Sequence, residues 1–240
     1  MSRPVALIVT APGTNRDADA AHAFDRAGAE PVIAGIRQLR EQPQRVDEAR
    51  VLCLAGGFSY ADALGAGRLW ALDLTSYLSD ALAAFVAAGK PVIGICNGFQ
   101  VLVRAGLLPG ALGHNARGSF VCRWVTLEPR SQRCVWTAAL DEPITCPVAH
   151  GEGRYVADDA LLAQLHADDR VALTYRDGNP NGSLDDIAGV CDETGLVLGL
   201  MPHPEDHVAD RQHPRRSRGE RGGLGLPLFA AAVVYAKGLS

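Results

Sequence analysis

Short apolar runs alternate with amphipathic segments along the first hundred residues. The runs at 5–9, 31–34 and 51–55 are continuous and apolar, as expected of strands covered on both faces. Segments 17–27 and 74–88 are typical of helices, and each is closed by a glycine. This repeated strand-then-helix order predicts a parallel, doubly wound sheet and therefore an α/β fold.

The second half of the chain is richer in strands than in helices. Runs typical of strands lie at 120–127, 134–137, 144–149, 171–175, 187–190 and 196–201. Helices fit residues 159–165 and 226–235. Because no internal repeat and no linker interrupts this pattern, we expect a single domain over residues 1–240.

One polar segment differs from its surroundings. Residues 210–225 carry five arginines among glycine, proline and histidine. This composition predicts a solvated, mobile Arg-rich loop within residues 206–225. The alternative is a local segment that binds phosphate or a partner.

The composition excludes several classes of function. Apolar residues make up 48% of the 240 residues, which is enough for a substantial core, and the net charge of −4 gives no basic field for nucleic acid. No apolar run is long enough to span a bilayer, and the first residues lack the apolar core of a signal peptide. We therefore expect a cytoplasmic protein that binds neither nucleic acid nor membrane.

The six cysteines are scattered along the chain without a C-x-x-C pair. This spacing disfavours a zinc ribbon or a thioredoxin-type motif, and most of these thiols are expected to be buried as small apolar groups. Cys96 alone has the local sequence of a reactive thiol.

Cys96 lies within residues 94–99, Gly-Ile-Cys-Asn-Gly-Phe, between an apolar run at 91–93 and a helical segment. Glycines two residues before and two after it give the G-x-nucleophile-x-G spacing of a nucleophile elbow, with cysteine replacing serine. At such a corner glycine avoids the clash of a Cβ, and the helix N-terminus favours a thiolate. The pattern predicts covalent chemistry at Cys96.

A base and an orienting carboxylate follow the last predicted strand. His203 and Glu205 are two residues apart, so on extended backbone their side chains point the same way, and Pro202 and Pro204 stiffen the segment. We predict a Cys96–His203–Glu205 triad, in which the histidine raises the thiolate content of the cysteine and the glutamate fixes the histidine tautomer. The alternative is a rigid turn without a catalytic role.

A second glycine corner, Gly56-Gly57, follows the predicted strand at 51–55. Its backbone N–H groups could form one half of an oxyanion hole, with the Asn97 N–H as the other half. The alternative is an ordinary turn. The chain contains neither a P-loop nor a dinucleotide-binding fingerprint.

Together these segments resemble the class I, triad-type glutamine amidotransferases, and within them the glutaminase subunits of phosphoribosylformylglycinamidine synthase. The family-type segments recur in order at 12–15 (Pro-Gly-Thr-Asn), 56–62, 94–100, 107–110, 148–155, 179–183 (Asn-Pro-Asn-Gly-Ser) and 201–205 (Met-Pro-His-Pro-Glu). The resemblance implies a flavodoxin-like sheet. It also implies that Gly57, Phe58 and Asn97 supply oxyanion and substrate contacts, and that Gln100 helps to hold glutamine.

The resemblance further implies the reaction. The chain would hydrolyse glutamine through a Cys96 thioester and deliver ammonia to a separate ATP-dependent synthetase subunit, which converts formylglycinamide ribonucleotide to the amidine in de novo purine biosynthesis. No cofactor is expected in this chain, ATP and magnesium are expected on the large partner, and a small third subunit is expected to join. The alternatives are another cysteine hydrolase on the same fold or a catalytically inactive regulatory subunit.

Three features near the predicted site leave questions open. In residues 150–154, His-Gly-Glu-Gly-Arg, His150 and Glu152 alternate like the predicted base and its carboxylate. Partner or channel contacts are the favoured interpretation, and a structural turn and a metal site are the alternatives. Ala61 and Asp206 stand where the resembling family usually has glycine and arginine.

Overall fold

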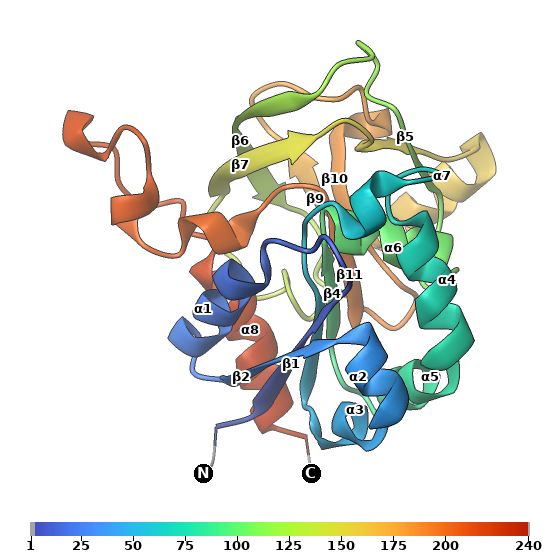
Figure 1. The fold of residues 1–240 in the computed structure, drawn as a ribbon. Helices are drawn as coiled ribbons and strands as arrows, with labels where there is room; N and C mark the ends of the chain where they lie inside the picture. The colour runs from blue at the N-terminus through green and yellow to red at the C-terminus, as the bar shows by residue number, and fades with distance from the viewer. Residues whose placement is uncertain (1–2, 240) are drawn as a thin grey trace.

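The computed structural model describes residues 3–239, and its central feature is a nine-stranded sheet within those residues (Figure 1). Five strands run parallel, in the spatial order β2 (Glu30–Gly35), β1 (Val5–Thr10), β3 (Val51–Leu54), β4 (Val92–Ile95) and β11 (Val197–Leu200). Four antiparallel strands extend the sheet, namely β10 (Ile187–Cys191), β9 (Val171–Tyr175), β6 (Val121–Pro129) and β7 (Ile144–His150). The predicted α/β fold, with a parallel first half and a strand-rich second half, is confirmed.

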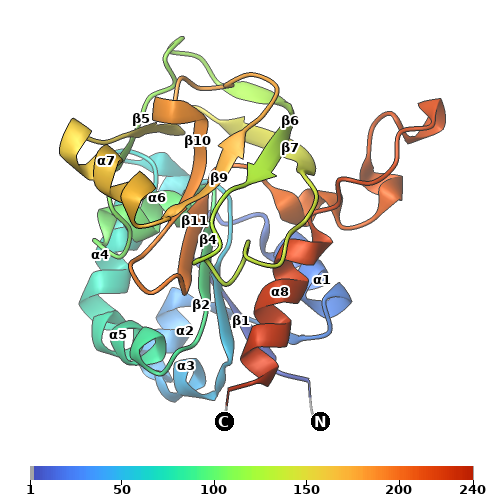
Figure 2. The same ribbon diagram turned by 180° about the vertical axis from the view of Figure 1, so that it is seen from behind.

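Helices cover both faces of the parallel strands (Figures 1 and 2). One face carries α1 (Asp17–Arg26) and α8 (Leu226–Lys237). The other carries α2 (Ile36–Glu41), α3 (Gln44–Glu48), α4 (Arg68–Tyr77), α5 (Ser79–Ala87) and α6 (Asn97–Arg104). Because the strands between these layers are covered on both sides, β3 and β4 are buried along their whole length. A two-stranded sheet of β5 (Ala111–Gly113) and β8 (Arg154–Val156) and the helix α7 (Asp159–Ala167) complete the fold.

An aromatic cluster fills the space beneath α1 and α8. The Phe24 ring meets Phe229 and Trp136 edge to face, at centroid distances of 5.1 and 6.5 Å. All three side chains are fully buried, and the Trp136 indole N–H donates to the carbonyl of Leu196. The indole therefore links the loop before β7 to the loop before β11.

Two element predictions are wrong. The helix predicted at 74–88 is two helices, α4 and α5, bent by 77° at Leu78. Leu74, Leu78 and Leu82 are all buried at a spacing of four residues, so the apolar pattern continues across the break and conceals it.

The strand predicted at 134–137 is a turn. The Ser131 hydroxyl accepts the backbone N–H groups of Arg133 and Cys134, and the Ser131 carbonyl accepts the Thr137 hydroxyl. These local bonds satisfy the backbone without a partner strand. The apolar character of the run reflects the burial of Trp136 in the core rather than strand pairing.

The segment 206–225 contains the short 3₁₀ helices η4 (Asp210–Gln212) and η5 (Arg216–Arg218) and projects from the body of the fold (Figures 1 and 2). Its mobility stays a prediction.

Among residues 3–239, no single helix is long and apolar enough to cross a membrane, and only the bent pair α4 and α5 would pass that test by length and composition.

Replacing Trp136 with alanine should lower the free energy of unfolding by about 3–5 kcal/mol, because the change removes a fully buried ring and its hydrogen bond to Leu196. Urea denaturation followed by circular dichroism measures the loss. Leu72→Ala, at a side chain that is 61% exposed, is the control and should change stability by less than about 0.5 kcal/mol. Equal effects of the two substitutions would contradict the assigned core.

Candidate active site

The backbone at Cys96 makes a sharp corner between β4 and α6. Cys96 has φ 50° and ψ −104°, outside the conformations that L-residues favour, and its N–H donates to the Leu200 carbonyl at 2.8 Å. A Cβ on Gly94 would lie 2.6 Å from the Gly98 carbonyl oxygen, and one on Gly98 would lie 2.0 Å from that of Leu54. The predicted elbow is present, and both glycines are needed for its close packing.

His203 and Glu205 lie beside this corner and are almost fully buried. The His203 Nδ1 is 2.7 Å from Glu205 Oε1, and Cys96 is close enough to raise the pKa of the same ring. The backbone route to this contact differs from the prediction, because Glu205 lies in a 3₁₀ helix, η3 (Pro204–His207), and not on extended chain. The structure nevertheless brings the three predicted side chains together.

At His203, the charges of neighbouring groups outweigh the effect of burial on the pKa. Burial lowers the pKa of the imidazole, but the Glu205 carboxylate and Cys96 raise it, and the net result lies well above the ordinary value of 6.5. With Nδ1 facing the carboxylate, Nε2 is the nitrogen left for the thiol. This arrangement favours an imidazolium beside the Cys96 sulfur, as the mechanism of a cysteine nucleophile requires of its base.

Asp206 adds a second carboxyl group beside Glu205. Burial, followed by the Glu205 charge, raises the pKa of Asp206 to about 6. The guanidinium of Arg16 lies 3.7 Å from this carboxylate and partly offsets the repulsion. Asp206, where the sequence departs from the resembling family, therefore interacts electrostatically with Glu205 of the predicted triad. It also pairs with Arg16, the residue that precedes α1.

The Gly56-Gly57 corner lies directly against the histidine. A Cβ on Gly56 would lie 2.8 Å from the Cε1 atom of His203. Gly57 has φ 149°, and within residues 3–239 its N–H has no hydrogen-bond acceptor, whereas the N–H of Phe58 donates to the Gly13 carbonyl at 3.1 Å. Of the predicted backbone donors, Gly57 is available for an oxyanion and Phe58 is not.

Asn97 and Gln100 form a chain of amide hydrogen bonds behind the thiol. Asn97 Oδ1 accepts the Ser59 N–H, and its Nδ2 donates to Gln100 Oε1 at 2.9 Å. Gln100 Nε2 donates to the Glu152 carbonyl at 2.5 Å. The Asn97 side chain is thus used structurally, while its N–H, in the first turn of α6, has no intrahelical acceptor. The substrate contact predicted for Gln100 stays a prediction.

A cavity of about 230 Å³ opens above Cys96. Gly57 and Gln100 line it from the two glycine corners, and the half-exposed rings of Phe58 and Phe120 face each other at 6.4 Å near it. The Ala149 carbonyl of β7 lies 3.8 Å from the Cys96 sulfur. The arrangement offers a nucleophile, a base and two free backbone donors around one small pocket, which suits acyl transfer from an amide.

A family model of the CobB/CobQ-like glutamine amidotransferase domain matches residues 3–236. The chain belongs to the CobB/CobQ-like glutamine amidotransferase family. It is similar to the phosphoribosylformylglycinamidine synthase subunit PurQ of Treponema denticola, with 46% identity over 97% of this chain and 99% of the relative. The subunit of the same name from Rubrobacter xylanophilus is 48% identical over 95% and 98% of the two chains.

Solved structures agree with this assignment. A chain of PurLQS from Thermotoga maritima is 37% identical and superposes with a TM-score of 0.81 over 97% of this chain and 99% of that one. A glutamine amidotransferase from the same organism, at 14% identity and a TM-score of 0.57 over 98% and 97%, shares the fold. The predicted family and fold class are confirmed.

His150, buried in the wall of the pocket above Cys96, has a tautomer set by its neighbours. The Asn115 amide nitrogen donates to the carbonyls of Ser119 and His150, so its Oδ1 is an acceptor, which takes the Gly153 N–H at 3.1 Å. His150 Nδ1, 3.1 Å from the same Oδ1, must therefore carry a proton.

Asn181 lies on the other side of the ring. Its amide nitrogen donates to the Gly153 carbonyl at 2.8 Å and faces His150 Nε2 at 3.5 Å. Burial, followed by the charge of His203, lowers the pKa of His150 to about 4, so the ring is neutral at pH 7. Together these contacts tie the 150–153 turn to Asn115 and Asn181.

The predicted alternatives for residues 150–154 can now be compared. Glu152 lies 3.6 Å from Arg104 and not against His150. His150 and Glu152 therefore do not form a second pair of a histidine base and its orienting carboxylate. Within residues 3–239, no group of three or more His, Cys, Asp or Glu side chains could hold a metal ion. The network supports the structural-turn alternative, and contact with a partner stays a prediction. Asn115, which no motif singled out, is the residue that sequence reasoning missed.

Gly98→Ala tests the packing of the elbow. Alanine has the higher helix propensity by about 1 kcal/mol, but its Cβ would overlap the Leu54 carbonyl, so stability should fall by about 1–3 kcal/mol. The matched control is Gly113→Ala, where a Cβ would meet no atom within 4 Å and the change should be near zero. Chemical denaturation separates the two, and a stabilised Gly98→Ala variant would contradict the close approach.

Glu205→Gln tests the electrostatics of the pair. Without the carboxylate, a main cause that opposes burial is lost, and the pKa of His203 should fall. The folded-state pKa of the wild-type imidazole is raised, so the pair contributes stability that is fully present below pH 6.5 and is lost as the pH rises through the folded pKa.

Histidine-selective NMR titration of the wild type and the variant measures this shift. Glu152→Gln, which removes a carboxylate paired with Arg104, is the control and should leave the titration of His203 unchanged. An identical His203 pKa in the wild type and in Glu205→Gln would show that the carboxylate does not hold the charge.

Proposed function

We propose that Cys96, His203 and Glu205 are the catalytic triad of a glutaminase, and that Gly57 and Asn97 stabilise the oxyanion through their N–H groups. The observation that carries the proposal is a thiol on a strained corner, beside a histidine whose Nδ1 is 2.7 Å from a buried carboxylate, at a small cavity. The chain is a glutaminase subunit of phosphoribosylformylglycinamidine synthase in purine biosynthesis, as its relatives are named.

The reaction follows from these positions. The Cys96 thiolate attacks the side-chain amide carbon of glutamine, and the negative charge on the carbonyl oxygen is held by the Gly57 and Asn97 N–H groups. The His203 imidazolium gives its proton to the departing ammonia and leaves a γ-glutamyl thioester. The neutral histidine then activates water, which hydrolyses the thioester to glutamate and restores the thiol.

The pocket wall defines the space that the substrate occupies. Phe58 contributes its side chain and not its N–H, and Gln100 presents an amide whose two ends are already bonded to Asn97 and Glu152. A substrate contact from Gln100 would therefore use its remaining N–H or oxygen lone pair. His150 remains neutral and holds the adjacent turn.

The chain works with a synthetase partner. The relatives are named as subunits of phosphoribosylformylglycinamidine synthase, and one solved relative is part of PurLQS. We propose, on the sequence resemblance, that the large subunit binds ATP and magnesium and uses the released ammonia on formylglycinamide ribonucleotide, and that a small third subunit joins. A cytoplasmic location belongs to the same proposal.

The assembled site does not favour the two alternative functions. An inactive regulatory subunit has no need of a cysteine held in a strained backbone conformation beside a buried His–Glu pair. A different cysteine hydrolase on the same fold would be expected to diverge from the synthase subunits, yet this chain aligns with them over nearly its whole length.

Cys96→Ala should abolish glutamine-dependent synthesis by the complex while ammonia-dependent synthesis continues. Loss of a covalent nucleophile costs at least about 10³-fold in rate, whereas the synthetase site is untouched. Initial rates of amidine formation with glutamine and with ammonium chloride measure the two activities.

Cys122→Ala is the matched control, because this thiol is exposed and lies outside the pocket. It should retain both activities. Undiminished glutamine-dependent synthesis by Cys96→Ala would contradict the assigned nucleophile, and loss of both activities in that variant would indicate a defect in the assembly of the complex.

A further inference from the structure

Residues 209–223, here called the arginine arm, form a projecting segment with an unusual charge. The arm carries five arginines against two acidic residues, in a chain whose net charge is −4. It leaves the body of the fold shortly after Glu205 and returns at α8 (Figures 1 and 2). A strongly basic projection on an acidic protein points to an acidic binding partner.

The base of the arm is anchored to the sheet. The Gly223 carbonyl accepts the Thr145 N–H of β7 at 2.7 Å, and His207 Nδ1 lies 2.5 Å from the Thr145 carbonyl. The Trp124 ring of β6 meets His207 and His213 edge to face, at 5.1 and 4.8 Å. These contacts fix the direction in which the arm leaves the fold.

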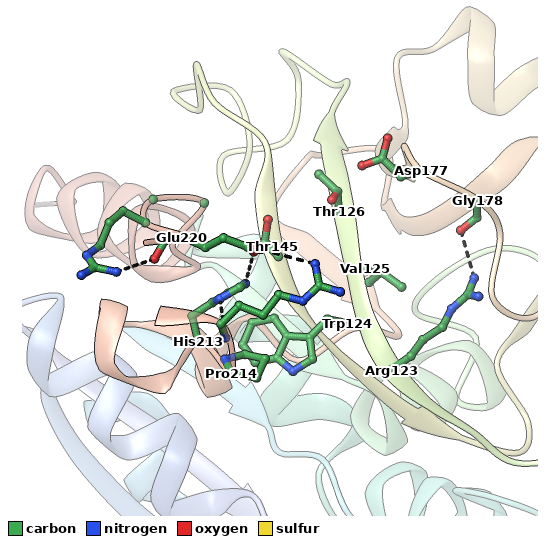
Figure 3. Close-up of a pocket in the computed structure, with 14 residues that line it drawn as sticks. Arg123, Trp124, Val125, Thr126, Thr145, Asp177, Gly178, His213, Pro214 and Glu220 are labelled. Atoms are coloured by element: carbon green, nitrogen blue, oxygen red, sulfur yellow. Dashed lines mark hydrogen bonds and ion pairs between the residues drawn. The ribbon is translucent and has the colours of Figure 1, made fainter. Parts of the chain in front are cut away.

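Between the arm and strands β6 and β7 lies an open cavity of about 720 Å³, lined in part by Arg123, Trp124, Thr126 and His213 (Figure 3). Its basic groups already have partners. Glu220 lies 3.3 Å from Arg215 and 3.6 Å from His213, and Arg123 donates to the Gly178 carbonyl.

Two further features make the cavity a poor site for a small anion. The Arg221 guanidinium donates to the carbonyls of Arg216 and Glu220, and the carboxylate of Asp177 lies in the cavity wall. No convergent set of unpaired donors remains to bind a phosphate. We therefore interpret the cavity as a gap between the arm and the sheet and not as a binding site.

The unpaired charges of the arm lie outside the cavity. Arg211, Arg216 and Arg218 are exposed, and none of their guanidinium groups makes a hydrogen bond or ion pair within residues 3–239. None of the three lines the cavity. Guanidinium groups pair bidentately with carboxylates and are enriched at protein interfaces. Three of them within eight residues therefore suit a surface rich in Asp and Glu.

We propose that the arginine arm docks on an acidic surface of the synthetase subunit, through Arg211, Arg216 and Arg218. This inference rests on the proposed function, which supplies the synthetase as the partner. The arm begins four residues beyond Glu205, so a partner that holds it lies near the edge of the sheet where the triad is built. Docking there would position the partner close to the source of ammonia.

The test is a charge-reversed triple variant, Arg211→Glu, Arg216→Glu and Arg218→Glu. The control reverses Arg26, Arg37 and Arg130, which are equally exposed and also make no ion pair within the described residues. Affinity for the purified synthetase subunit is measured for the wild type and both variants at about 0.05 M and 0.5 M salt.

We expect the arm variant to bind the synthetase at least about tenfold more weakly than the wild type at low salt, with a smaller difference at high salt because exposed charges are screened. The control variant should bind like the wild type. Both variants should keep the wild-type unfolding temperature. Glutamine-dependent synthesis by the arm variant should recover when its concentration is raised above the weakened dissociation constant.

Three outcomes would overturn the inference. Equal synthetase affinity of the arm variant and the wild type at both salt concentrations would remove it and leave the proposed function intact. If the arm variant bound the synthetase like the wild type but bound a mixed-sequence duplex DNA more weakly, the arm would be assigned to nucleic acid. A wild-type chain that does not bind the synthetase would refute the proposed function, and all three proteins would then fail alike.

Discussion

The tight corner between β4 and α6 is the constraint on which the site depends. A side chain on Gly94 would overlap the Gly98 carbonyl, one on Gly98 would overlap the Leu54 carbonyl, and Cys96 takes up the turn with a positive φ. Strand β11 runs parallel beside β4, with Ile95 paired to Leu200, so the chain leaves both strands at the same edge. The thiol and His203 therefore meet because of strand register, although more than one hundred residues separate them.

Four amide side chains around this corner, those of Asn97, Gln100, Asn115 and Asn181, are held by specific hydrogen-bond partners. Asn97 and Gln100 connect Ser59, beside the Gly56-Gly57 corner, to the turn after β7, and Asn115 and Asn181 hold the neutral ring of His150 against that turn. Such networks keep reacting groups in place without motion of the backbone. The charge on His203 is supported by Glu205, and both groups are buried.

The sequence predicts the parts of this structure that local pattern determines, and it misses the parts that tertiary contacts determine. The parallel strands and the elbow follow from continuous apolar runs and glycine spacing, whereas the break at Leu78 leaves no mark because the buried leucines continue across it. The apolar run around Trp136 is buried as a turn. At the site, the grouping of Cys96, His203 and Glu205 could be predicted from motifs. The 3₁₀ turn at Glu205 and the role of Asn115 could not, because they depend on elements distant in sequence.

The most direct measurement of the central claim is covalent labelling with an electrophilic glutamine analogue. The complex is incubated with the analogue, and the digested chain is mapped by mass spectrometry at all six cysteines. The account predicts modification at Cys96 alone, blocked by excess glutamine and reduced in Glu205→Gln. Modification of another cysteine in preference to Cys96, or labelling that glutamine does not compete with, would contradict the assignment of this elbow as the glutaminase site.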